Sequence, residues 1–398
     1  MIRRLIAVLI FFACAGWLPA QEFKLFDRTV QVHGFASQGF IHTDDNNWLT
    51  MYTSNIGSGE FTDLGANAST QITDSFRIGA QIYDRNLGHL GKWHPSLDWA
   101  YAQYKFKPWL GIRGGKVKTV MGLYNDTQDL DFLHTFALLP QSVYPIDLRD
   151  TTIAHEGGDI FGDIHLGNRP GTLSYTAFAG HRQDSQYGGY AYLLTNQGMT
   201  FDGIGGLQYG GDLRWATPLK GLLMGISRMN QDMSLKGAVN MPGIGSVAIR
   251  LNDMSDWTNQ YYGQYSWKKL VVDAEYRRYY MLMGSNGVPS AEEDIRGWYL
   301  AGSYQIAKRV QLGSYYSRYW ISFPIAYVGQ PPATGHDYDK VVTGRVDLNR
   351  FMNIKVEGHF MDGYGLPNLY PNGFYTGVNP LGLKPNTIAL VVKTGFNF

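Results

Sequence analysis

Apolar and polar residues alternate along the last twelve residues of the chain, TIALVVKTGFNF. Ile388 and Leu390 fall on one side of an extended strand and Lys393 falls on the other, because successive side chains of a strand point to opposite faces. The same period of two recurs in DWTNQYYGQYSW, LQYGGDLRW, NIKVEGHF, KVVTGRVDL and FRIGAQIYDR. Burying a charged face in a dry core is costly, whereas a water-filled interior accepts it. The pattern therefore predicts strands with one face in lipid and one in water.

About sixteen segments carry this pattern, and the links between them alternate in length. Short turns occur at ITDSF, FKPWL, GNRPG, TPLKG, SWKKL, IAKRV and LNRF, with longer Gly-, Asn-, Asp- and Pro-rich links between them. This predicts an all-β fold, a transmembrane antiparallel β-barrel of about 16 strands with short periplasmic turns and long extracellular loops. The predicted strands are 30–41, 59–72, 76–85, 97–106, 109–118, 159–167, 172–181, 206–216, 220–229, 256–267, 269–280, 295–306, 309–320, 338–348, 351–361 and 387–398.

The first twenty residues, MIRRLIAVLIFFACAGWLPA, have the layout of a secretory signal peptide: two arginines, an apolar core and small residues before the cut. We expect cleavage after Ala20, which leaves 21–398 as the barrel; a lipoprotein signal ending at Cys14 is the alternative. Because Cys14 is the only cysteine, the mature chain would have no disulfide, thiolate metal site or haem attachment site. Export predicts an integral protein of the bacterial outer membrane.

Composition agrees with a barrel and argues against a nucleic-acid partner. Hydrophobic residues make up 44% and aromatic residues 14% of the chain, with 48 glycines, yet no apolar run of about eighteen residues follows the leader. Loss of Arg3 and Arg4 from 34 basic residues leaves 32 against 33 acidic ones. A chain with so little net charge has no bulk attraction to nucleic acid.

The sequence offers no recognisable catalytic or cofactor motif. None of the ten histidines lies in an HExxH spacing, and there is no GxSxG elbow. The segment GIRGGKVKT fails as a phosphate-binding loop, because Leu110 replaces the first glycine and Val117 follows the lysine. TDDNN at 43–47 lacks the rest of a calcium loop. We therefore expect no enzymatic activity, no cofactor and no metal site.

With its leader, strand pattern, alternating links and terminal GFNF, the chain resembles the Gram-negative outer-membrane porin superfamily over everything after the signal peptide. The resemblance implies a water-filled channel for passive diffusion of small hydrophilic solutes and ions. It also implies that the barrel assembly machinery of the outer membrane reads the C-terminal strand at Phe396 and Phe398. As in many porins, three barrels could associate as a homotrimer.

The widest gap in the pattern is 119–158, about forty residues without alternation. Loops of this length are usually functional, and this one falls where general diffusion porins carry a loop that folds inward and narrows the pore. The resemblance thus implies a pore constriction in which the loop acids face wall arginines across a transverse field. In the alternative, the acids face solvent and the arginines pair with neighbouring strands. The expected constriction residues are Asp126, Asp129, Asp131, Arg77, Arg85 and Arg113.

Two further assignments follow from strand parity. Arg278 falls on the outer face near the extracellular end of its strand, where it would reach the phosphates of lipopolysaccharide among the outer-membrane lipids. The inward positions carry both signs of charge, which favours general diffusion over a substrate-selective channel or the sheath of an electron-transfer conduit. The expected lumen-lining residues are Asp212, Arg214, Asp273, Glu275, Arg277, Arg345, Asp347, Lys355 and Glu357.

Overall fold

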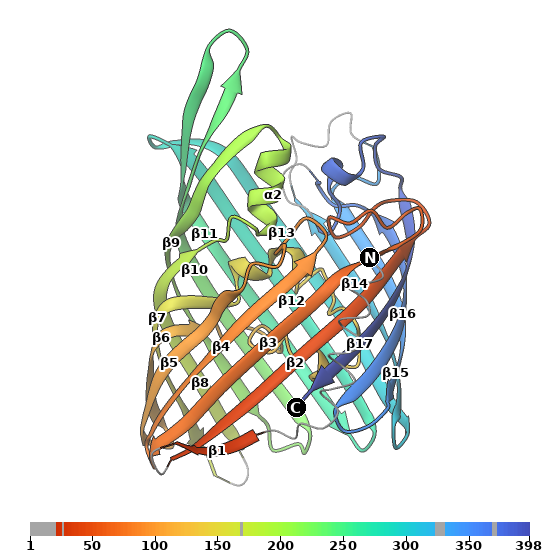
Figure 1. The fold of residues 1–398 in the computed structure, drawn as a ribbon. Coiled ribbons are helices and arrows are strands. Elements are labelled where there is room, and N and C mark those ends of the chain that lie inside the picture. The colour runs from red at the N-terminus through yellow and green to blue at the C-terminus, as the bar shows by residue number, and fades with distance from the viewer. Residues whose placement is uncertain (1–20, 26–27, 168–169, 323–330, 368–371) are drawn as a thin grey trace.

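The chain forms a closed β-barrel in a computed structural model that describes residues 21–25, 28–167, 170–322, 331–367 and 372–398 (Figure 1). The expected signal peptide, residues 1–20, lies outside the described residues. Sixteen antiparallel strands, β2 to β17, make the wall, and the short β1 (Gln21–Leu25) pairs with β2 at one end. No helix in the described part of the chain is long and apolar enough to cross a membrane.

The strands of the wall follow one another around the barrel in chain order. They are β2 (Arg28–Thr43), β3 (Ser58–Thr73), β4 (Phe76–Leu87), β5 (Ser96–Lys107), β6 (Leu110–Lys118), β7 (Ala154–His165), β8 (Thr172–Gln183), β9 (Met199–Ala216), β10 (Leu222–Met241), β11 (Gly245–Trp267), β12 (Leu270–Ser285), β13 (Val288–Ala307), β14 (Val310–Ile321), β15 (His336–Asp347), β16 (Met352–Gly363) and β17 (Asn386–Asn397). The helical segments are η1 (Asp131–Leu133), η2 (Ile146–Thr151), α2 (Gly189–Asn196) and η3 (Thr376–Val378).

Each of the sixteen predicted segments overlaps one strand of the wall, so the predicted fold is confirmed. Several strand boundaries were wrong, among them the starts of β9 and β13, which lie seven residues earlier than predicted. The strand β7 begins at Ala154 rather than at 159, because Gly157 and Gly158 have no side chains to display an alternation. The long link expected after 229 is instead a two-stranded ribbon in which β10 and β11 continue to a short turn at 242–244, high above the barrel (Figure 1).

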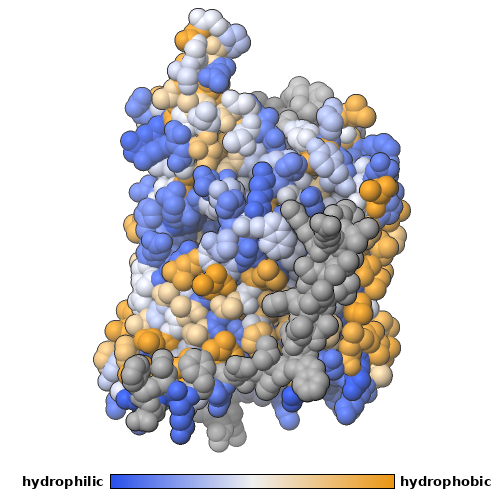
Figure 2. Space-filling view, viewed as in Figure 1, coloured by the Kyte–Doolittle hydropathy of each residue, from blue (hydrophilic) through white to orange (hydrophobic). Residues whose placement is uncertain are grey.

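The two faces of the wall differ as the alternation predicts. On β17, Ile388 and Leu390 are 51% and 45% exposed on the outside, whereas Lys393 is 5% exposed inside. Figure 2 shows an apolar surface over the flank formed by β15–β17. A wall with apolar side chains outside and polar side chains inside suits lipid outside and water inside.

Pairing of the last strand with the first strand of the wall closes the barrel. Antiparallel pairs run from Ala389 with Thr43 to Asn397 with Phe35. Beyond them, the backbone N–H of Phe398 donates to the carbonyl of Gly34 at 2.9 Å, and the N–H of Gly34 donates back at 3.2 Å. Closure leaves no unpaired strand edge in hydrocarbon.

Candidate functional site

Residues 119–153, the link between β6 and β7, fold into the barrel and are called the inner loop below. The loop is five residues shorter than the predicted 119–158, since β7 begins at Ala154. Its apolar side chains are buried against the wall: Phe136 and Tyr144 pack with Tyr299 and Tyr315 of β13 and β14. The loop therefore crosses the lumen from β6 to the far wall.

The first attachment of the inner loop is the carboxylate of Glu275 on β12. It accepts hydrogen bonds from the backbone N–H of Leu123 at 3.1 Å and from the hydroxyl of Tyr144 at 2.6 Å. On the wall side it accepts from the hydroxyl of Tyr299 at 2.5 Å and the amide of Gln260 at 2.7 Å. With four donors on one buried carboxylate, this attachment is fully hydrogen-bonded and rigid.

The second attachment joins the loop to two lysines of β16 and β17. Lys355 donates to the backbone carbonyls of Asp131 and Phe136 at 2.7 and 3.0 Å. The carboxylate of Asp131 lies 3.1 Å from the ammonium groups of both Lys355 and Lys393. Burial alone would raise the pKa of the Asp131 carboxyl, but the two lysines hold it below its usual value. Asp131 is therefore ionised as a bridge between two buried cations.

Beside the lysines, Glu357 of β16 holds the apolar turn of the loop. Its two carboxylate oxygens accept the backbone N–H groups of Ala137 and Leu138 at 3.0 and 3.1 Å. The ring of buried His359 lies 3.0 Å from Glu357 and 2.7 Å from Asp339, so both ring nitrogens face carboxylates. This geometry favours the doubly protonated ring, which balances part of the acid charge.

The third attachment lies on the wall near β4, β5 and β6. Asp129 accepts from Lys118 at 2.7 Å and from the amide of Gln81 at 2.9 Å, and Arg149 of η2 pairs with Asp98 at 2.8 Å. Burial would raise the pKa of the Asp129 carboxyl, but Lys118 and Arg149 lower it. The sequence did not predict this role of Arg149, because the loop has no periodicity from which to assign the direction of its side chain.

The predicted arginine face of the constriction does not form as expected. Arg113 pairs with Asp159 on the neighbouring β7 at 2.9 Å, and Arg77 donates to a serine of the neighbouring β3. These two follow the alternative in which wall arginines pair with adjacent strands. Arg85 does reach the inner loop, where it donates to the carbonyl of Ile146 at 2.7 Å.

The three predicted loop acids point to different walls. Asp129 faces Lys118, whereas Asp131 faces the lysines of β16 and β17. Asp126 is half-buried, and no salt bridge joins it to a cation in the described residues. The expected pairing of these acids with Arg77, Arg85 and Arg113 is therefore wrong, because the loop spans the lumen and its acids meet cations on both sides.

The charged residues predicted to line the lumen face the interior, and most of them hold the loop. Arg214 donates to the carbonyl of Gly122 at 2.8 Å, and Arg277 donates to that of Val143 at 3.1 Å. Further contacts are those of Arg345 with the carbonyls of Phe132 and His134, of Asp273 with the Tyr124 hydroxyl, of Asp347 with Arg345, and of Asp212 with Ser227 and Tyr262.

The inner loop divides the lumen into an outer and an inner cavity. The outer cavity, about 320 Å³, lies below the extracellular links, and the inner cavity, about 360 Å³, opens toward the β11–β12 turn. A narrow space of about 30 Å³, called the waist, adjoins both: Tyr83 and Arg149 also line the outer cavity, and His134 and Leu139 also line the inner one. About one or two waters fit in such a volume.

His134 stands where the waist meets the inner cavity. Its ring lies 3.0 Å from the backbone carbonyl of Thr127 and edge-on to Tyr124. Burial is the main cause that lowers the pKa of His134, to about 4. The ring is therefore neutral at neutral pH and adds no charge to the waist.

Solved structures with the same architecture cover nearly the whole chain, although no family model and no curated protein sequence matches it. The in-vitro folded OmpT, an outer membrane protein of Vibrio cholerae, has a TM-score of 0.58 and 12% identity over 95% of this chain and 100% of that one. An anion-selective porin from Comamonas acidovorans has a TM-score of 0.59 and 10% identity over 93% and 100%. OmpF of Salmonella typhi, in complex with daunomycin, has a TM-score of 0.54 and 13% identity over 95% and 100%.

Proposed function

Since the chain has a porin-type, outer-membrane β-barrel fold, we propose that it is a channel for passive diffusion of small hydrophilic solutes and ions. The observation that carries the proposal is the pair of polar cavities on either side of the inner loop, inside a wall that is apolar outside. The waist between them supports a restriction to small solutes, because its volume is only about 30 Å³.

The charges around the outer cavity support general diffusion over a substrate-selective channel. Arg85, Arg149 and Arg182 line it together with the carboxylates of Asp98 and Asp150. Both signs of charge line this cavity, so neither cations nor anions are drawn in strongly by a uniform field.

Conductance in planar bilayers tests the proposal. We expect discrete current steps that grow with salt concentration, and faster swelling of protein-containing liposomes by urea than by a pentose. Absence of both steps and swelling from correctly folded protein would overturn the channel. A reversal potential that shows selectivity for the same sign of ion at all salt concentrations would favour the substrate-selective alternative. Haem absorbance that co-purifies with the protein would favour the electron-transfer sheath.

We further propose that the channel is not catalytic, that it resides in the outer membrane, and that it associates as a homotrimer. One structure of V. cholerae OmpT is described as a trimer form, which supports the last point for this fold. Chemical cross-linking of folded protein in outer-membrane vesicles tests the oligomer. A ladder that ends at three subunits is expected, and a monomer alone would contradict it.

A further inference from the structure

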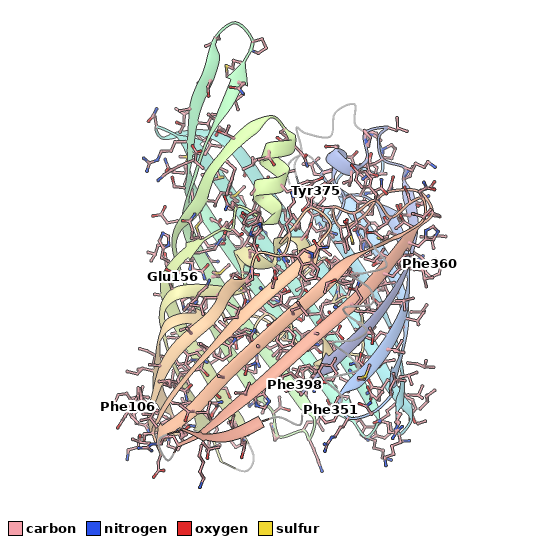
Figure 3. The ribbon with its side chains drawn as sticks, viewed as in Figure 1. Phe106, Glu156, Phe351, Phe360, Tyr375 and Phe398 are labelled. Atoms are coloured by element: carbon pink, nitrogen blue, oxygen red, sulfur yellow. The ribbon has the colours of Figure 1, made fainter. Side chains whose placement is uncertain are left out.

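A cavity of about 320 Å³ lies at the periplasmic mouth of the lumen and is called the turn pocket below. It is enclosed by the β13–β14 turn, the β15–β16 turn and Phe132 of the inner loop. Among the described residues, none lines both the turn pocket and the outer cavity, the inner cavity or the waist. Figure 3 shows Phe351, in the β15–β16 turn, at this end of the barrel.

The turn pocket faces the lumen and not the lipid. Arg345 stands opposite the inward-facing Lys355 in the strand register, and Asn353 lies two residues before Lys355 on the same strand. Asn397 lies four residues after the inward-facing Lys393. Residues an even number apart on one strand share a face. Since an acyl chain outside the wall cannot follow a head group into this space, the pocket suits a solute and not a membrane lipid.

The lining of the turn pocket is strongly cationic. Its charged side chains are those of Lys308, Arg309, Arg345, Arg350 and Asp347. Arg345 is paired with Asp347 at 2.8 Å and bonds to two carbonyls of the inner loop. Within the ranges that the structure describes, Lys308, Arg309 and Arg350 form no salt bridge. Three positive charges therefore line the pocket without an acid to balance them, which favours an anion there.

Neighbouring groups hold two of these cations beside the pocket. Arg309 donates to a backbone carbonyl of the β15–β16 turn at 3.0 Å, and the guanidinium of Arg350 lies 4.4 Å from the ring centroid of Phe351. A guanidinium has five N–H donors, so each of the two keeps donors for a ligand. The backbone oxygen of the terminal Phe398 accepts the N–H of Gly34 at 3.2 Å, on the β2 side of the seam.

Three asparagines add amide groups to the cations. The side-chain oxygen of Asn349 accepts the backbone N–H groups of Phe351 and Met352 at 2.8 and 3.0 Å, which leaves its amide N–H groups as donors. Asn353 is only 2% exposed, and its side-chain oxygen has no hydrogen-bond partner in the described part of the chain. A buried acceptor without a partner is unfavourable, so this oxygen indicates a donor, such as a hydroxyl group, on a bound ligand. The third asparagine is Asn397.

The chemistry and the size of the turn pocket together define the class of ligand. Hydroxyl groups both donate to and accept from amides, whereas phosphate oxygens accept charge-assisted hydrogen bonds from guanidinium and ammonium groups. A phosphate monoester carries about 1.5 to 2 negative charges at pH 7, which suits three unbalanced cations better than one carboxylate does. A volume of about 320 Å³ is at the lower end for small-molecule sites, so it admits a single sugar unit.

We propose that the turn pocket binds a monosaccharide phosphate, with its phosphate group on Lys308, Arg309 and Arg350 and its hydroxyl groups on the asparagines. Guanidinium groups bind phosphate oxygens in pairs and keep their charge at all pH values. The inference goes beyond passive diffusion, because it adds a binding site at the periplasmic mouth. It does not depend on conduction, since a solute can reach the pocket from the periplasmic side.

Isothermal titration calorimetry of the detergent-solubilised barrel with glucose 6-phosphate, at low ionic strength where screening is weak, tests the inference. The variant Lys308→Gln/Arg350→Gln should bind at least about tenfold more weakly than the wild type, because it removes two charged donors. Arg345, which holds the inner loop, stays in place in this variant. The control Lys107→Gln/Lys220→Gln removes the same charge from exposed lysines at other periplasmic turns and should bind as the wild type does.

The variant Asn353→Ala separates recognition of the sugar from recognition of the phosphate. It should weaken binding of glucose 6-phosphate about fivefold, the usual value of one net hydrogen bond, because it removes the amide that meets the sugar hydroxyls. It should leave the weaker binding of inorganic phosphate unchanged. Glucose, which lacks the phosphate group, should give no measurable heat at millimolar concentration.

Any of three results would overturn the inference. One is a Lys308→Gln/Arg350→Gln barrel that, shown to be folded by its heat-modifiable gel mobility, binds glucose 6-phosphate as tightly as the control. Another is inorganic phosphate that binds the wild type as tightly as glucose 6-phosphate, which would make the pocket a site for simple anions. The third is a wild-type barrel that gives no heat with millimolar glucose 6-phosphate. A barrel that binds glucose 6-phosphate but passes no current would support the turn pocket and contradict only the channel.

Discussion

At the residue scale, the loop acids differ in whether they form a salt bridge with a wall cation. Asp129 and Asp131 are locked into ion pairs, whereas Asp126 has no salt-bridge partner among the described residues. The alternation of side chains along each strand placed the wall charges on the inner face, because this alternation depends only on neighbouring residues. It could not pair them with the loop, because the path of a loop without periodicity depends on contacts across the whole barrel.

Replacement of Asp126 by Asn should therefore change ion selectivity, and replacement of Asp131 by Asn should change stability. Loss of the Asp126 charge shifts the reversal potential toward anions in about 0.1 M salt, where charges act over about 10 Å, and much less near 1 M, where they act over about 3 Å. Asp131→Asn leaves buried Lys355 without its counter-charge and buried Lys393 with only Asp63, at 3.5 Å, which should lower the free energy of unfolding by about 3–5 kcal/mol. Planar-bilayer recordings and urea titrations measure the two effects, and each variant is the control for the other. Equal effects of both variants on selectivity would contradict this division.

Stability should also depend on His134. Its pKa is about 4 in the folded protein, below the usual value of about 6.5, so the unfolded chain binds more protons between these limits. Stability is therefore fully present above about pH 6.5 and falls as the pH drops toward 4, by up to about 3 kcal/mol. Urea midpoints measured between pH 7 and pH 4 should show this loss in the wild type and a smaller one in His134→Gln. An identical pH profile in both would exclude His134 as the cause.

At the element scale, the inner loop is a segment held by carboxylates that accept its backbone N–H groups. The sequence predicted its position from the absence of alternation, but Gly157 and Gly158 hid the start of β7. The fixing role of Glu275 and Glu357 could not be predicted, since their partners lie more than a hundred residues away in the chain. Local patterns thus predict strands, and contacts between distant segments decide what the inward charges bind.

Release of the inner loop is the expected result of Glu275→Ala/Glu357→Ala. The change removes the two wall carboxylates that accept loop N–H groups, which should cost at least about 3 kcal/mol of unfolding free energy, because hydrogen bonds to charged groups contribute about 1.5–3 kcal/mol each. Single-channel conductance should rise and become noisy as the waist opens. Glu292→Ala is the control, because Glu292 is an exposed glutamate on the outer face of β13. An unchanged, quiet conductance would show that the loop does not limit the channel.

At the scale of the whole molecule, the C-terminal strand packs at the barrel seam, and we propose that the assembly machinery also reads it. Phe396 is buried, with ring centroids 6.5 Å from Phe351 and 6.0 Å from Phe398, so it is part of the packing near the barrel seam. Phe398 is only partly buried and contributes backbone bonds to Gly34. Figure 3 shows Phe398 and Phe351 near the same end of the barrel, whereas Phe360 lies on the outer flank. Packing and recognition by the assembly machinery can therefore be separated experimentally.

Deletion of Phe398 should lower the amount of folded barrel in the outer membrane while it leaves the purified protein nearly as stable as the wild type. The prediction rests on our proposal that the assembly machinery reads Phe398. Its removal costs two backbone bonds at the seam, each worth about 1 kcal/mol, and the contact of its partly buried ring with Phe396. Phe396→Ala, by contrast, empties a buried site and should cost about 3–5 kcal/mol in refolding experiments as well. Phe360→Ala removes an exposed aromatic ring from the neighbouring strand and serves as the control for lost lipid contact. Heat-modifiable gel mobility of membrane fractions and urea titration of refolded protein measure the two quantities. If the Phe398 deletion loses stability in detergent to the same degree as yield in cells, the residue acts through closure of the barrel and not through recognition.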